Sequence, residues 1–427
     1  MNIVYITAGA GGMHCGSCTR DAELVRALRD DGHDVLMLPL YTPPRVDGPS
    51  PAEDRIFYGG LNAWLEQHFS LFRRPLGAIE RLLDSPSLLR WVSRMAVSTE
   101  ARDLGEMTVS VLKGREGKQE KELERLMGFL ERQVRPDVVH ITNSLLSMLA
   151  PEIQERLGIP VVCGLQGESD FVEQFPEPWK DEAVELIRRH ARAVDVFTVP
   201  YEGYIEDMAE FLDEDPSRFR VVPPGIHPDP PGDESGGSGG PVRIGYLSRI
   251  RREKGIDLLV EAFRRLQSGD GTEAHLWVAG ELPKPAEQLW EELRDSLQED
   301  GLGECLDFRG ELDGPEKEQF LADCDVMALP SRQLECRGMA CLEAMAAGLP
   351  VVVPERGIFP EIVERTGGGL LFPPEDVESL ACALEELTTD AERRRTMARH
   401  ARQGVDEHYS ARRAAEAALA VSREVAD

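Results

Sequence analysis

The sequence predicts an α/β protein with two doubly wound domains, each built on a parallel sheet with helices on both faces. Short apolar runs alternate with amphipathic stretches of helical length along most of the chain. One Gly- and Ser-rich stretch, residues 229–241, interrupts this alternation and is typical of a flexible linker. The 427 residues are enough for two domains that each bury a core.

The first predicted domain covers residues 1–228. It opens with the strand NIVYIT, a Gly-rich loop, a helix from about Thr19 to Asp30 and a second strand, DVLMLPL. A long segment, residues 42–135, then delays the return to the sheet, and we expect a helical insertion there. Three stretches of the insertion have helical periodicity: residues 56–69, 77–96 and 120–134. The later strands are PDVVHIT, IPVVCG, VDVFTVP and RVVPPG.

The second predicted domain covers residues 242–410. Its strands are RIGYL, AHLWVAG, CLDFRG, VMALP and PVVVP, and a helix is expected after each. A last helix within residues 411–427, from about Ala411 to Val425, has the apolar spacing of a helix that packs against another element.

The stretch SRQLECRGMACLEAMAAGLPVVVP holds two carboxylates near the start of a short helix. We expect this helix from Gly338 to Ala347, between two buried strands, with Gly348 as its stop. Glu335 lies in the loop before the helix, and Glu343 lies more than one turn inside it. The pattern predicts a strand–helix–strand unit whose functional edge is the carboxyl end of the first strand.

Backbone N–H groups at this helix start favour an anion. The N–H groups of Gly338, Met339 and Ala340 have no partner inside a helix, and the helix dipole adds positive potential there. Glu335 and Glu343 could flank a bound phosphate and accept hydrogen bonds from sugar hydroxyls on either side. The alternative is an ordinary helix with one loop glutamate and one exposed glutamate.

A second stretch, VRIGYLSRIRREKGIDLLVEAFRRL, places cations after a strand. The strand breaks at Ser248 and a helix begins at about Ile256, so Arg249 and Lys254 lie in the loop between them. A cluster of cations at a strand's carboxyl end in so acidic a chain indicates an anionic partner, for which a diphosphate is suited. The alternative is a solvated basic loop that offsets local acidic residues.

These two segments, followed by GGGLLFPPED, resemble the C-terminal half of the family 4 retaining glycosyltransferases. The resemblance implies the GT-B architecture, with the donor bound mainly by the second domain and the last helix crossing to the first. It assigns the donor diphosphate to Arg249 and Lys254, the donor sugar hydroxyls to Glu335 and the ribose to Glu343. Arg337 departs from the pattern, because the family usually has an aromatic residue at this position.

The loop after the first strand, AGAGGMHCGSC, does not match the dinucleotide fingerprint G-x-G-x-x-G, so no nicotinamide cofactor is indicated. In the resembled family a Gly-rich loop here approaches the donor, and Gly11 and Gly12 are the candidates. A plain strand-to-helix turn is the alternative. Cys15 and Cys18 form a CxxC at the start of the helix, where a thiol pKa is lowered. With His14 alone beside them the set is incomplete for zinc, and packing is favoured over a redox role.

Gln166 stands where the resembled family usually has a histidine near the anomeric centre of the donor. A carboxamide can hydrogen-bond a sugar hydroxyl or the leaving oxygen, but it cannot act as an acid or base. A retaining reaction in which the leaving phosphate takes the acceptor proton needs no protein base. His140 and Asp170 are possible substitutes, although a lone strand histidine is more often structural.

Charge and composition exclude several classes of protein. The net charge of −29 argues against nucleic acid and anionic membrane surfaces as partners. The sequence has no apolar run of about 18 residues, and no signal peptide is expected at the N-terminus. The eight cysteines are scattered, which suits a reducing compartment, so we expect a cytoplasmic protein. There is no Asp-rich metal motif, and no cofactor or metal is predicted.

The sequence therefore predicts transfer of a hexose from a nucleoside diphosphate sugar to a carbohydrate or other hydroxyl acceptor, with retention of configuration. A nucleotide-sugar epimerase or hydrolase of the same fold would convert the donor without an acceptor. A non-catalytic nucleotide-sugar binding protein is compatible with Gln166 and Arg337. A redox module would depend on Cys15 and Cys18. The base, the sugar, the acceptor and the oligomeric state are not predicted.

Overall fold

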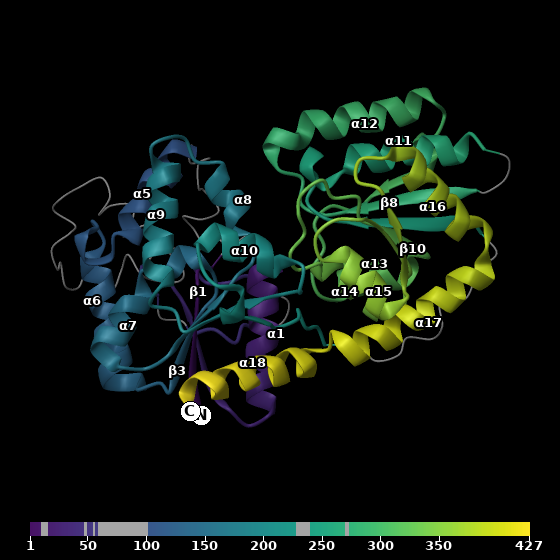
Figure 1. Cartoon of the computed structure of the whole chain (residues 1–427). Coiled ribbons are helices and arrows are strands. Elements are labelled where there is room, and N and C mark those ends of the chain that lie inside the picture. Colours follow the sequence, from purple (N-terminus) through teal and green to yellow (C-terminus); the bar gives the residue numbers. More distant parts are fainter. Residues whose placement is uncertain (10–15, 47–48, 54–55, 59–100, 228–239, 270–272) are drawn as a thin grey trace. The chain divides into compact units, whose positions relative to one another are not determined.

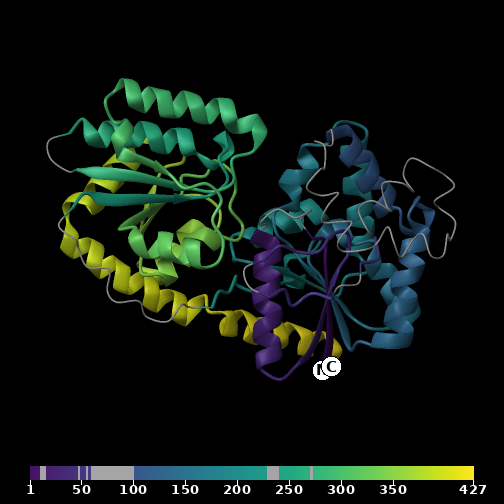
Figure 2. The same cartoon turned by 180° about the vertical axis from the view of Figure 1, so that it is seen from behind.

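The computed structural model describes residues 1–9, 16–46, 49–53, 56–58, 101–227, 240–269 and 273–427. The chain divides into two compact units, each with its own sheet (Figures 1 and 2). Unit 1 contains Met1–Gly225 together with Ala411–Asp427, and unit 2 contains Ile226–Ser410. The last helix therefore belongs to the same unit as the first strand.

The sheet of unit 1 has six parallel strands in the order β2-β1-β3-β4-β5-β6. The strands are β1 (Asn2–Thr7), β2 (Asp34–Pro39), β3 (Val138–Ile141), β4 (Val161–Gly164), β5 (Val196–Val199) and β6 (Phe219–Val221). The inner strands β3, β4 and β5 are buried along their whole length, as expected for strands covered on both faces. The strand order reverses between β1 and β3, which places the switch point of this sheet there.

The first and last helices of the chain cover one face of this sheet. Helix α1 (Gly16–Asp30) packs against α18 (Ala411–Ala426), and both contribute to one core with residues from β1 to β5. Small residues on α18, among them Ala414, Ala415 and Ala418, are buried in this core. The remaining α-helices described in unit 1 are α5 (Ala101–Leu112), α6 (Glu120–Phe129), α7 (Leu149–Leu157), α8 (Glu168–Glu173), α9 (Trp179–Ala191) and α10 (Tyr204–Leu212).

The sheet of unit 2 also has six parallel strands, in the order β12-β11-β10-β7-β8-β9. The strands are β7 (Val242–Leu247), β8 (Ala274–Ala279), β9 (Leu306–Phe308), β10 (Val326–Ala328), β11 (Val351–Pro354) and β12 (Gly369–Phe372). The order reverses between β7 and β10, so the loops after these two strands meet at the switch point.

Helices cover both faces of the second sheet (Figure 1). Helices α11 (Ile256–Gln267), α12 (Glu287–Glu299) and α16 (Val377–Thr389) share one core with the strands. Helices α14 (Met339–Ala346) and α15 (Phe359–Thr366) contact α17 (Ala391–His408) at the other face, and α13 (Pro315–Asp323) precedes β10. Right-handed connections between parallel strands produce this two-sided cover.

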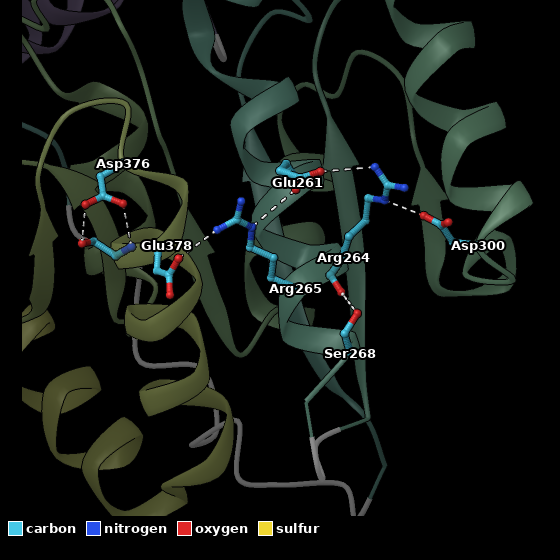
Figure 3. A network of polar contacts seen from close by, with 8 residues as sticks. Glu261, Arg264, Arg265, Ser268, Asp300, Asp376 and Glu378 are labelled. Carbon is cyan, nitrogen blue, oxygen red and sulfur yellow. Dashed lines mark hydrogen bonds and ion pairs between the residues drawn. The ribbon is translucent and has the colours of Figure 1, made fainter.

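The solvent side of α11 carries a network of surface ion pairs, shown in Figure 3. Arg265 contacts Glu261 of its own helix and Glu378 of α16, and Arg264 contacts Glu261 and Asp300. All of these side chains are at least 37 % exposed, so each pair contributes little to stability. We call this group of residues the surface network.

The α/β class with two doubly wound parallel sheets is confirmed, and most predicted strands lie where expected. Several described elements were not predicted: the strand β12, which begins in a run of glycines, the helix α5, the helices α7 to α10 of unit 1, and the helices α16 and α17 of unit 2. Of the predicted helical stretch 56–69, residues 56–58 are described and are not helical, and the rest lies outside the described residues, as does the predicted stretch 77–96. Helix α6 covers the third predicted stretch and ends in a π-helical turn, Leu130–Val134. Within the described part of the chain, no helix has the length and apolar character needed to span a membrane.

Candidate active site

The candidate site lies at the switch point of unit 2, where the loops after β7 and β10 meet. The β7 loop carries Arg249 and Lys254, and the β10 loop carries Glu335 and leads into α14. Ligands of doubly wound sheets bind at this position, outside the carboxyl ends of the strands. The fold therefore brings together Lys254 and Glu335, which are 81 residues apart in the sequence.

Backbone and side-chain contacts hold the two loops against each other. Gly255 has φ +73°, and a Cβ at this residue would lie 1.9 Å from the carbonyl oxygen of Pro330, so only glycine fits. Arg332 makes a two-pronged pair with Asp257 of α11, at 2.7 and 3.1 Å. The backbone N–H of Arg332 also donates to the carbonyl of Glu253. These contacts fix the relative position of the loops before any ligand binds.

Lys254 and Glu335 form an ion pair across the two loops. The same carboxylate oxygen, Oε1, accepts a hydrogen bond of 3.1 Å from the Ser331 hydroxyl. Among the residues that the structure describes, none donates to the other oxygen, Oε2. The Glu335 side chain is 18 % exposed, so one oxygen is anchored while the other is available to a ligand hydroxyl.

The charge of Glu335 is stabilised by its surroundings. Burial raises the pKa of this carboxyl, but the opposing effects of Lys254, of Arg337 and of the Ser331 hydroxyl are together larger. The net result is a pKa below the ordinary glutamate value. Glu335 is therefore an anion at neutral pH and accepts hydrogen bonds without donating any, which suits the binding of sugar hydroxyls.

Helix α14 begins one residue later than predicted, at Met339, with Gly338 as its N-cap. Gly338 has φ +61°, and a Cβ there would lie 2.9 Å from the side chain of Ile362. In the part of the chain that the structure describes, no group accepts a hydrogen bond from the N–H of Gly338, Met339 or Ala340. Three adjacent donors beside Glu335 can therefore bind an anion.

The two other side chains predicted to bind the nucleotide sugar, Glu343 and Arg249, each pair with a residue of opposite charge. Glu343 lies on α14 and accepts a hydrogen bond of 3.2 Å from Lys317 of α13. Arg249 lies 3.4 Å from Glu281, which follows β8, and both side chains are about one third exposed. A pair this exposed is weak and can be displaced by a diphosphate, which binds arginine more strongly.

Unit 1 holds Gln166 in a buried polar cluster after β4. Its Nε2 donates to the carbonyl of Thr142 at 2.7 Å and to Asp21 at 3.3 Å, and its backbone N–H donates to Glu168 at 2.6 Å. Because both side-chain partners only accept hydrogen bonds, the carboxamide is oriented with its nitrogen toward them. Glu168 also accepts from the backbone of Ser144, so it joins the loops after β3 and β4.

Asp21, which binds Gln166, also lines a small cavity together with other buried residues. Its neighbour Arg20 is 5 % exposed and lies 3.8 Å from the Asp21 carboxylate. Tyr5 stacks on His140 with ring centroids 4.4 Å apart. These side chains line a cavity of about 10 Å³, which is close to the space that one water molecule needs.

His140 is placed as a structural residue. Its Nε2 lies 2.8 Å from the hydroxyl of Ser422 on α18, and that hydroxyl donates to the carbonyl of Ala418. Since the serine has one proton and donates it to Ala418, His140 Nε2 is the donor in this contact. Burial and the nearby Arg20 lower the pKa of His140 to about 3. Asp170, the other possible base, has a pKa raised by burial and by Glu173.

Several other predicted residues lie outside the part of the chain that the structure describes: Gly11, Gly12, His14 and Cys15. Cys18 is described and is buried in α1. No group of three residues able to bind a metal is found within the described ranges.

Two family descriptions match the chain and between them cover most of its length. "Glycosyl transferase 4-like domain" matches residues 16–225, and "Glycosyl transferases group 1" matches residues 233–404. The chain belongs to the family 4 glycosyltransferases. The sequence resemblance is confirmed, and the site described above lies in the group 1 part of this glycosyltransferase.

Known proteins similar to this glycosyltransferase share its fold. Anabaena HepE, in a crystal structure with UDP, superposes with a TM-score of 0.67 at 16 % identity, over 99 % of this chain and all of that one. The catalytic domain of starch synthase IV from Arabidopsis thaliana, bound to ADP and acarbose, gives a TM-score of 0.67 at 13 % identity, over 100 % and 99 % of the two chains. The GT-B fold is confirmed.

A curated relative is the D-inositol 3-phosphate glycosyltransferase of Stackebrandtia nassauensis, which is 28 % identical over 281 residues. The aligned part covers 61 % of this chain and 62 % of that relative. The chain thus matches less than two thirds of the length of this relative.

Sequence reasoning missed several residues that hold the candidate residues in each unit. In unit 2 they are Ser331 and Lys317, which bind the two glutamates, and the pair of Arg332 and Asp257. In unit 1 they are Glu168 and Asp21, which bind Gln166. Ser331 and Arg332 were within reach of a pattern argument, since they lie in the short segment between the end of β10 and Glu335. The partners of Glu343 and Gln166 come from distant segments, and no local signal indicates them.

Proposed function

We propose that this glycosyltransferase moves a hexose from a nucleoside diphosphate sugar to an acceptor hydroxyl with retention of configuration. One observation carries the proposal: the ion pair of Lys254 and Glu335 at the switch point of unit 2, with Oε2 of the glutamate available beside three backbone donors. A cation, an anion that accepts hydroxyl protons and a helix N-terminus are the groups that a nucleotide sugar requires.

Each residue has a proposed role. Arg249 and Lys254 bind the diphosphate and stabilise the negative charge that develops on it as the bond to the sugar breaks. The N–H groups of Gly338, Met339 and Ala340 also bind the diphosphate and stabilise its negative charge. Glu335 accepts a hydrogen bond from a sugar hydroxyl, and Glu343 accepts from the ribose, as in the resembled family. Gly11 and Gly12 remain candidates for close approach to the donor.

The proposed reaction needs no protein base. The acceptor oxygen bonds to the anomeric carbon on the face that the diphosphate leaves, and the acceptor proton passes to the departing phosphate oxygen. Gln166 orients a donor hydroxyl or the leaving oxygen, because its carboxamide hydrogen-bonds but does not titrate. No cofactor or metal is proposed, and the cytoplasm is the proposed compartment. The proposal does not name the base of the nucleotide, since HepE is described with UDP and starch synthase IV with ADP.

The test begins with a thermal-shift screen of uridine, guanosine and adenosine diphosphates. The wild-type chain is expected to be stabilised by one of them, since a ligand that binds the folded state raises its stability by mass action. The corresponding sugar nucleotides are then incubated with polyol and sugar acceptors, and the product is analysed by NMR. An axial donor is expected to give an axial product.

Other outcomes separate the alternatives. Loss of donor in the absence of any acceptor indicates a hydrolase or an epimerase. Binding without turnover, across a broad set of acceptors, indicates a binding protein. A product of inverted configuration contradicts the proposed mechanism, and the absence of any stabilising nucleotide contradicts the donor site itself.

A further inference from the structure

The loop after β7 can bind one diphosphate with both of its cations only if its two ends are held together. Arg249 stands at the beginning of this loop and Lys254 at its end, just before Gly255. The loop runs between the strand and α11 and contains only one short 3-10 turn, Arg252–Lys254. Within the described residues, no backbone hydrogen bond joins Arg249 to Lys254, and the amide of Lys254 donates to the carbonyl of Arg251 instead.

The hydroxyl of Tyr246 contacts both ends of the loop. It lies 3.2 Å from the carbonyl oxygen of Arg249 and 3.3 Å from the carbonyl oxygen of Lys254. Both carbonyls only accept hydrogen bonds, and the phenol has one proton, so the two contacts form a three-centred hydrogen bond. One buried side chain is thus shared by the backbones of the two residues assigned to the diphosphate.

Tyr246 is also firmly anchored. It lies in β7, which pairs with β8 on one side and with β10 on the other, so its backbone is held in the middle of the sheet. The side chain is 0 % exposed and belongs to the main core of unit 2. A core tyrosine usually has its hydroxyl at the surface or bonded to one partner, whereas this one joins the two ends of a functional loop.

We infer that Tyr246 is a positioning residue, which sets the spacing of Arg249 and Lys254 for a diphosphate through its hydroxyl. The inference rests on the proposed donor site and adds a residue that no motif indicates. Tyr246 does not touch the ligand in this account. Its loss weakens recognition of the diphosphate and leaves recognition of the nucleoside unchanged.

Tyr246→Phe tests the inference, because it removes the hydroxyl and keeps the ring in the core. Tyr409→Phe is the matched control. Tyr409 is in the same unit, is 1 % exposed, and its hydroxyl has no hydrogen-bond partner among the described residues. Calorimetric titration measures the affinity of wild type and both variants for the nucleoside diphosphate that the screen identifies and for the corresponding nucleoside. Thermal melting checks that both variants fold.

Tyr246→Phe is expected to weaken diphosphate binding by roughly 3- to 10-fold, the effect of losing one hydrogen bond, with nucleoside affinity unchanged. Tyr409→Phe is expected to bind both as the wild type does. Equal loss of nucleoside and nucleoside diphosphate, or no loss of either, overturns the inference while the donor site stands. Failure of the wild type to bind any of the three diphosphates contradicts the proposed function instead.

Discussion

Both units place polar side chains at the carboxyl end of a six-stranded parallel sheet, but the two clusters differ in burial and in the use of their hydrogen-bonding groups. In unit 1, Arg20 and Asp21 are at most 5 % exposed, and Gln166 is held by two acceptors. In unit 2, the side chains of Lys254 and Glu335 are 26 % and 18 % exposed, and one oxygen of Glu335 is available. In the first cluster the buried Arg20 and Asp21 stabilise the fold, whereas the pair of Lys254 and Glu335 in the second can exchange partners with a ligand.

The surface network of α11 supplies a third kind of polar cluster, with the same residue types as the candidate site. Its arginines are paired with carboxylates on α11, on α16 and after α12 (Figure 3). These pairs are more exposed than the pair of Lys254 and Glu335. Pairing alone therefore does not indicate function, and the position at the switch point of the sheet distinguishes the site.

The largest effect is expected in unit 1, from Asp21→Ala. The substitution leaves the Arg20 cation buried without its carboxylate, which should cost about 3–5 kcal/mol in the free energy of unfolding. Chemical denaturation measures the loss. The double variant Arg20→Met/Asp21→Leu removes both charges and should recover most of the stability. If the single and double variants are equally unstable, the buried charge is not the cause.

Glu335→Gln should have the next largest effect, and on activity rather than on stability. The variant keeps the shape of the side chain but loses the charge that binds Lys254 and accepts sugar hydroxyls. We expect kcat/KM to fall by about 100-fold, in the range seen when one group that stabilises a transition state is removed. Glu261→Gln in the surface network should stay within about twofold of wild type. If kcat/KM falls equally in Glu335→Gln and Glu261→Gln, the candidate site is no more important for activity than the surface network.

The fold and the positions of the candidate site residues in the sequence were predictable, because both depend on local sequence patterns. Strands can be placed within a few residues from buried apolar runs such as VRIGYL and VVVP. The end of α14 can be placed from the glycine that follows it. Helix α5 escaped prediction because it contains a glycine and β-branched residues, which lower helix propensity. Tertiary packing overrides that preference: a Cβ on Gly105 would lie 3.1 Å from the side chain of Trp179 on α9.

The partners of the functional residues could not be predicted from local patterns. Asp21 and Gln166 are 145 residues apart, and Lys254 and Glu335 are 81 residues apart. The resemblance assigned roles to Lys254 and Glu335, but which atoms they contact depends on how two loops meet. The hydroxyl of Tyr246 has the same property, since a buried tyrosine on a strand has no signature that distinguishes it from any other core residue.

A smaller effect concerns pH and tests the view that His140 in unit 1 is a structural residue. His140 has a pKa of about 3 in the folded chain, below its ordinary value, so the unfolded chain binds a proton that the folded chain excludes. Stability from this residue is complete above about pH 6.5 and declines as the pH falls toward 3, by about 2 kcal/mol at pH 5.

The variant His140→Gln tests this dependence, because a carboxamide can donate to Ser422 and does not titrate. Denaturation of wild type and variant between pH 7 and pH 4.5 should show a shallower acid loss for the variant. Parallel curves would mean that His140 is protonated in the folded chain, contrary to the low pKa that burial gives it.

The smallest effect is expected from Arg265→Ala. Its two pairs are on the surface, so the free energy of unfolding should change by no more than about 0.5 kcal/mol, and less at high salt. Asp257→Ala, which removes the partner of the less exposed Arg332 between the two loops, should cost about 1–3 kcal/mol. Denaturation at low and high salt compares the two. Equal effects would indicate that the loop pair is no more important than the surface network.

The most direct test of the donor site compares two double variants that remove the same charge. Calorimetric titration measures the affinity of Arg249→Ala/Lys254→Ala and of Arg264→Ala/Arg265→Ala for the nucleoside diphosphate that stabilises the wild type. The first variant should bind about 100-fold more weakly or worse, because two charge-assisted contacts are lost. The second should bind within about twofold of wild type. Retained affinity in the first variant, or equal losses in both, would contradict a donor site at the switch point of unit 2.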